Sequence, residues 1–277
     1  MTDVYGSRPI LCAGRSIGKG IVQRSVRYRT WGKYLMKPLN FALCFALSLF
    51  LANQAAVGQQ TISWHQRLTL IVETPQGEVR GSAVTEVTNV LTDGDWVLPE
   101  ARGVRSTTKG EAVVVEVTPG HYLFALLDGV DHFAYAAFAL NTHPDPTEHS
   151  YEAAMRKLAS VPLDTPAALD PNDVARQMHD AGFPILVTFT DITDPKTVRK
   201  VDPENLAASF GPGVSLKAAT LEVTQEPVSE RQVEAVLGWL GEIWPNMLDG
   251  RRYQTIKATN RLANSLGAGS FSTEIRK

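Results

Sequence analysis

The chain has 277 residues, of which 44% are hydrophobic and 20% charged, the composition of an ordinary globular protein. Its net charge of -2 is unevenly spread, because residues 1–35 carry seven basic side chains and one acid, whereas residues 38–277 carry a net charge of -9. An acidic domain repels phosphate backbones, which disfavours nucleic-acid binding. The only cysteines are Cys12 and Cys44, so the chain beyond them has no disulfide, thiol ligand or thiol nucleophile.

The first predicted element is an export signal. Residues Phe41–Ala52 form a 12-residue run that is apolar except for Ser48. This length suits the ~7–15-residue core of a signal peptide and falls short of the ~20 residues that span a bilayer. The small residues Ala56 and Gly58 predict cleavage before Gln59.

The basic leader, residues 1–35, is longer than the positive end of an ordinary signal peptide. We favour the interpretation that the true start is Met36, which makes residues 36–58 a well-proportioned signal peptide. The alternative is that residues 39–58 stay uncleaved and anchor the protein in the inner membrane. In both cases the basic flank remains cytoplasmic, so residues 59–277 are predicted to be periplasmic or otherwise exported.

The exported part is predicted to be a single α+β domain, because no Pro/Gly/Ser-rich linker divides it. Its first half indicates an antiparallel β-meander of about four strands, the first of which is residues Trp64–Glu73, where apolar and polar side chains alternate. A turn at Pro75–Gly77 leads into a second extended run, Val79–Val90, so these two strands are predicted to form a hairpin.

A second hairpin is predicted to join residues 112–118 to residues 121–127. Pro119 and Gly120 lie between them, and this pair suits the two central positions of a type II turn. Residues 93–110, between the two hairpins, are predicted to form a loop.

The second half is predicted to mix helices and strands. Asp145-Pro146 and Asp170-Pro171 indicate helix starts, because aspartate accepts the free amides of the first turn and proline has no amide to leave unpaired. Residues Phe183–Thr190 are apolar on both faces, as in a buried central strand. Residues Val214–Thr224 are a further strand, in which the alternation slips at Ala218-Ala219 and indicates a β-bulge.

The clearest helix signal follows this strand. Ser229 and Gln232 have the spacing of a capping box, and an apolar stripe runs on from Val233 to Leu240. The whole predicts one antiparallel sheet, extended by the strands at 184–190 and 214–224, with helices packed on one side.

One candidate site is a cluster of ligand-type side chains in residues 128–149. Imidazole and carboxylate groups suit zinc or manganese, so Asp131, His132, His143 and His149 are weak candidates for a metal site. Neighbouring acids in this segment are explained by a turn and a helix cap, and the four that remain do not have a recognised metal-ligand spacing.

A second candidate lies in residues 190–202, directly after the predicted central strand. Loops at the carboxyl ends of strands in α/β sheets often bind ligands, so Asp191 is a weak candidate for a general base and Lys196 for an anion contact. The alternative is that the Asp-Pro pairs here mark turns and that Asp191 is a lone carboxylate. The sequence contains no recognised motif for nucleophilic catalysis, a zinc protease or dinucleotide binding.

Three stretches carry a resemblance to a family of uncharacterised bacterial exported proteins. They are LTLIVETPQGEVRGSAV near the start of the domain, Phe183–Val228, and NRLANSLGAGSFSTEI at the end. The resemblance spans nearly the whole exported part and excludes the leader before Met36. It implies export, and it implies no activity, cofactor or catalytic residue.

From these observations we expect an exported envelope protein that is not an enzyme and needs no cofactor. It would bind a protein or a small molecule in the cell envelope, bind no nucleic acid, and touch the membrane only through its N-terminal segment. The alternative function is a metal-assisted hydrolase that uses the 128–149 or the 190–202 loop.

Overall fold

The computed structural model describes residues 59–92, 97–98, 102–138, 140, 148–172, 182–254 and 258–276. All of them belong to the unit Asn53–Lys277. The predicted leader, signal peptide and anchor lie outside the described residues, as does the helix predicted to follow Pro171.

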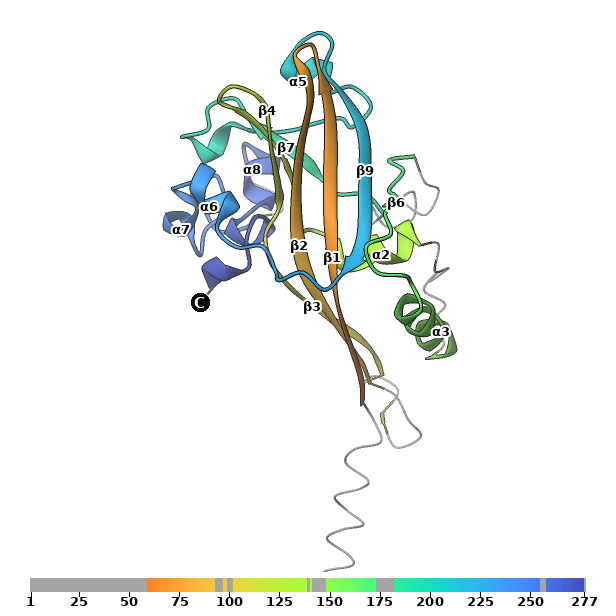
Figure 1. The fold of residues 1–277 in the computed structure, drawn as a ribbon. Coiled ribbons are helices and arrows are strands. Elements are labelled where there is room, and N and C mark those ends of the chain that lie inside the picture. The colour runs from red at the N-terminus through yellow and green to blue at the C-terminus, as the bar shows by residue number, and fades with distance from the viewer. Residues whose placement is uncertain are drawn as a thin grey trace, which may run out of the picture. The chain divides into compact units, whose positions relative to one another are not determined.

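Five antiparallel strands form the first sheet, in the order β3-β2-β1-β9-β6. The strands are β1 (Gln59–Thr74), β2 (Gly77–Thr92), β3 (Gly103–Lys109), β6 (Ala167–Ala168) and β9 (Ser215–Thr224). β1 and β2 pair along their full lengths, from Gln59 opposite Thr92 to the turn at Gly77, which confirms the first predicted hairpin (Figure 1).

Side-chain alternation gives this sheet one buried and one polar face. In β1 the buried apolar residues are Trp64, Leu68, Leu70 and Val72, while His65, Arg67 and Thr69 are only partly covered. The predicted bulge in β9 is also present: Ile71 pairs with Ala218 and Val72 with Leu216, which leaves Lys217 as the extra residue. The irregularity therefore lies one position before the predicted Ala218-Ala219 step.

Four shorter strands form a second sheet, in the order β4-β5-β7-β8. They are β4 (Val113–Thr118), β5 (His121–Ala125), β7 (Leu186–Phe189) and β8 (Val198–Lys200). β4 and β5 confirm the second predicted hairpin, and Gly120 at its turn has a φ of 77°, as the third residue of a type II turn requires. All four residues of β7 are buried, which confirms the predicted central strand.

Two expectations about the sheets are wrong. The first half does not form one meander, because β1–β3 and β4–β5 belong to different sheets. Part of the predicted loop at 93–110 is strand β3, which pairs with β2 from Glu86 to Thr92. β3 was missed because its residues are mostly exposed, so that no buried face produces an apolar alternation.

The α-helices described are α2 (Val130–Ala137), α3 (Glu148–Ala159), α5 (Ala207–Phe210), α6 (Gln232–Val236), α7 (Leu240–Ile243) and α8 (Arg261–Ser265). Residues of α2 and α3 join the core between the two sheets, whereas α6, α7 and α8 cover the other face of the second sheet. The prediction of helices on one side is therefore wrong. In Figure 1 the C-terminal helices gather on the side of the molecule away from β9.

The prediction of a capping box at Ser229 is also wrong. The hydroxyl oxygen of Ser229 accepts a hydrogen bond from the amide of Val84 in β2, at 2.9 Å. The helix starts later, and its Val233 amide donates to a carboxylate oxygen of Glu111 at 3.0 Å. A residue 122 positions earlier in the chain thus caps α6, and such a long-range partner leaves no local sequence signal.

The mixed helices and antiparallel sheets establish the α+β class, while the single-domain assignment stays a prediction. Within the described part of the chain, none of the helices has the length and apolar character needed to span a membrane.

Candidate functional site

A groove of about 580 Å³ lies where β9 ends beside β1. Its lining comes from β1, from the end of α3 and the chain after it, and from the end of β9: Ile62, Ser63, Trp64, His65, Leu158, Ala159, Val161, Leu163, Val223, Thr224 and Gln225. Most of these side chains are apolar, and His65 is the only titratable one among them.

Different lengths of neighbouring strands create this groove. β9 pairs with β1 only as far as Thr224 opposite His65, whereas β1 continues to Gln59. The chain after α3 closes the other side, because the amide of Asp164 donates to the carbonyl of Val223 at 2.8 Å. Leu163, just before this hydrogen bond, has 47% of its surface exposed and is one of the few large apolar side chains open to solvent.

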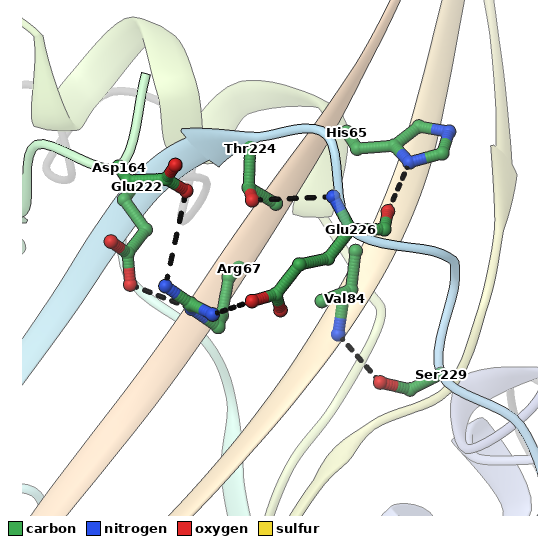
Figure 2. A network of polar contacts seen from close by, with 8 residues as sticks. All are labelled: His65, Arg67, Val84, Asp164, Glu222, Thr224, Glu226 and Ser229. Carbon is green, nitrogen blue, oxygen red and sulfur yellow. Dashed lines mark hydrogen bonds and ion pairs between the residues drawn. The ribbon is translucent and has the colours of Figure 1, made fainter. Parts of the chain in front are cut away.

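The groove has a charged rim centred on Arg67, which points out from β1 (Figure 2). Its guanidinium donates to Glu222 at 2.7 Å and to Glu226 at 2.5 Å, and lies 4.0 Å from Asp164. The hydrogen bonds from Arg67 to Glu222 and Glu226 raise the pKa of Arg67 above its usual value. Three carboxylates around one guanidinium leave this rim with a net negative charge.

A segment that we call the strap, residues 225–231, runs from β9 across the polar face of β1 and β2 (Figures 1 and 2). Near its start, His65 Nδ1 donates to the carbonyl oxygen of Glu226 at 2.6 Å, which requires the proton to be on Nδ1. At its far end, Ser229 exchanges two hydrogen bonds with the backbone of Val84. The strap therefore takes the chain away from the line of β9 and leaves the groove open.

The metal-site candidates are only partly within the described residues. Asp131 and His132 lie on α2 and form an ion pair of 3.0 Å. Burial would raise the pKa of Asp131, but hydrogen bonds from His132 and Ser106 hold it below its usual value, and the bond to Asp131 raises the pKa of His132. His143 and the side chain of His149 lie outside the described residues. Among the side chains that the structure describes, no group of three or more metal-ligand residues is brought together.

The Asp191 candidate lies in the connection between β7 and β8. Its carboxylate accepts hydrogen bonds from the hydroxyl and the amide of Thr193, at 2.7 and 2.9 Å, and these lower the pKa of Asp191. Lys196 lies in the short 3-10 helix Pro195–Thr197, and its amide donates a hydrogen bond to a carboxylate oxygen of Asp194 at 3.0 Å. Because β7 is antiparallel to both of its neighbours, the rule for parallel sheets that motivated this site does not apply. A functional role for Asp191 and Lys196 stays a prediction.

Sequence reasoning placed Trp64 and Arg67 on opposite faces of a strand but did not identify the groove. The groove joins segments near residues 64, 160 and 224, and no local pattern indicates that they meet. The one signal that points to it is Arg67, a charged side chain in the middle of a strand, between Gln66 and Leu68.

Comparisons with protein-family models, curated proteins and solved structures gave no match for the chain. The resemblance to exported bacterial proteins therefore remains an expectation from the sequence.

Proposed function

We propose that this protein is an exported, non-enzymatic binding domain that holds a ligand of the cell envelope in the groove between β1, β9 and the end of α3. The groove carries this proposal, because it combines a concave apolar lining with a few polar groups at its edge, as ligand sites generally do. Its ligand is a protein or small molecule and not a nucleic acid, and membrane contact is through the N-terminal segment alone.

The chemistry of the groove favours binding over catalysis. Its one titratable side chain, His65, donates from Nδ1 to a backbone carbonyl. The neighbouring acids Glu222 and Glu226 both accept hydrogen bonds from the guanidinium of Arg67, so their carboxylates are engaged in the rim. The hydrolase alternative gains no specific support, because Asp131 pairs with His132 and Asp191 bonds within its own loop.

A neutral apolar fluorophore, N-phenyl-1-naphthylamine, tests the groove directly. We expect saturable binding to the exported domain, about tenfold weaker in Leu163→Asp, because a charge then stands at the mouth of the apolar lining. Leu163 is half exposed, so the substitution should leave folding intact.

Leu98→Asp is the matched control, since Leu98 is 66% exposed and is not part of the groove. The control should bind the fluorophore like the wild type. Absence of saturable binding in the wild type, or equal binding by the wild type and Leu163→Asp, contradicts the proposal.

A further inference from the structure

The part of β1 that faces the groove is the edge of a sheet. Within the described residues, Thr61–Trp64 pair only with β2, because the pairing with β9 stops at His65. In a strand, alternate residues direct their amide and carbonyl groups to opposite sides, so this segment has backbone groups directed toward the groove. Such an edge is a template for an added strand.

The sequence and pairing of this edge lack the charge, the proline and the bulge that commonly block strand addition. Thr61-Ile62-Ser63-Trp64 contains no charge and no proline, and its register with β2 continues without a bulge. β9 would cover this edge of β1 if it continued beyond Thr224. Instead the chain leaves β9 at Gln225 and crosses to the opposite edge of β2, where Ser229 binds Val84.

The side chains beside this edge suit one face of an extended peptide. Trp64, Leu158 and Val223 are buried at the floor of the groove, and Leu163 stands at its mouth. Apolar side chains at every second position of an added strand would point toward this floor, while the intervening side chains would point toward the rim on the polar face.

The rim determines which intervening side chains fit. Glu226 has 49% and Asp164 60% of its side chain exposed, whereas Arg67 is largely covered by its acidic partners. A peptide with lysine or arginine at the intervening positions is therefore complementary in charge to the rim.

We infer that the groove is a strand-addition site, in which an extended peptide with alternating apolar and basic residues pairs with β1 at Thr61–Trp64 and continues the line of β9. This inference rests on the proposed binding function and specifies its ligand as a polypeptide segment. Main-chain hydrogen bonds supply affinity in this mode of recognition, and the side-chain pockets supply specificity.

Isothermal titration calorimetry with three capped peptides tests the inference. In the first peptide valine and lysine alternate, the second has the same sequence with every backbone nitrogen methylated, and in the third glutamate replaces lysine. We expect the first alone to bind and to displace the fluorophore N-phenyl-1-naphthylamine. Asp164→Asn should weaken its binding about two- to fivefold at low salt, whereas Glu242→Gln, an exposed acid on α7, should not.

Equal binding of the methylated peptide overturns the inference, because pairing with β1 would then contribute nothing. So does binding of the first peptide without displacement of the fluorophore. If the fluorophore binds to the groove and none of the peptides does, strand addition fails while the proposed binding function stands.

Discussion

Glu111 shows how one side chain can determine where a helix begins. It is 1% exposed, and one of its carboxylate oxygens accepts the hydrogen bond from the Val233 amide that caps α6. The other oxygen, and one oxygen of the nearby Glu234, are buried without a hydrogen-bond partner among the described residues. Burial, opposed by the bond from Val233 and reinforced by the charge of Glu234, raises the pKa of Glu111.

The raised pKa predicts a pH dependence of stability. The folded protein holds the Glu111 proton more tightly than the unfolded chain, so the stability that this group contributes is present below its unfolded pKa of about 4.5 and is lost as pH rises through the folded pKa. Glu111→Gln keeps an acceptor for Val233 and cannot ionise. Relative to wild type, the variant should gain about 1–3 kcal/mol in free energy of unfolding between pH 4.5 and pH 8.

Urea unfolding at a series of pH values measures this difference. Glu242→Gln serves as the control, because Glu242 is an exposed acid on α7 whose charge is not among those that shift the pKa of Glu111, so the difference it gives should change little with pH. A pH-independent difference for Glu111→Gln as well would show that Glu111 has the same pKa in the folded and the unfolded chain.

At the scale of elements, the sequence predicted what depends on one strand or one turn. The alternation in β1, the turn at Gly120 and the fully buried β7 follow from local patterns, and the structure confirms all three. The sequence did not predict the contacts between residues that are far apart in the chain. Ser229 binds β2 instead of capping a helix, and that hydrogen bond joins residues 145 positions apart.

The same limit applies to the groove. Its three walls come from β1, the end of α3 and the end of β9, so the sequence shows its apolar residues only as parts of separate periodic segments. The sequence pattern places Arg67 on the polar face of β1. It does not predict that the acidic neighbours of Arg67 are Asp164, Glu222 and Glu226, because these residues are far from it in the chain.

The contact between the two sheets depends on a glycine. Gly81 of β2 crosses β4 so closely that an added Cβ would overlap the carbonyl oxygen of Val114, an atom that can move only with its strand. Gly81→Ala should therefore lower the free energy of unfolding by about 1–3 kcal/mol or more.

Denaturant unfolding, compared with that of Gly241→Ala, tests this prediction. Gly241 lies in α7 with open space around its Cα, so alanine there should leave stability unchanged or raise it by up to about 1 kcal/mol. Equal stabilities of Gly81→Ala and wild type would mean that the sheets can separate at this crossing without cost.

At the scale of the whole molecule, a predicted export signal precedes a domain with an apolar groove, which we propose binds a ligand. The described residues carry the groove, its acidic rim and the strap that keeps it open. The predicted signal at residues 36–58 would deliver this domain to the envelope, where an apolar groove can meet its ligand outside the cytoplasm.

Native and denaturing mass spectrometry of C-terminally tagged protein, recovered from the envelope of its own host, tests both halves of this account. We expect the mass of a polypeptide that begins at Gln59. We also expect a non-covalent adduct on the native ion, present in the wild type and in Leu98→Asp and lost in Leu163→Asp. A mass that retains Met1 or Met36 would contradict cleavage. An adduct that is absent from the wild type, or that Leu163→Asp retains in full, would contradict the groove as the binding site.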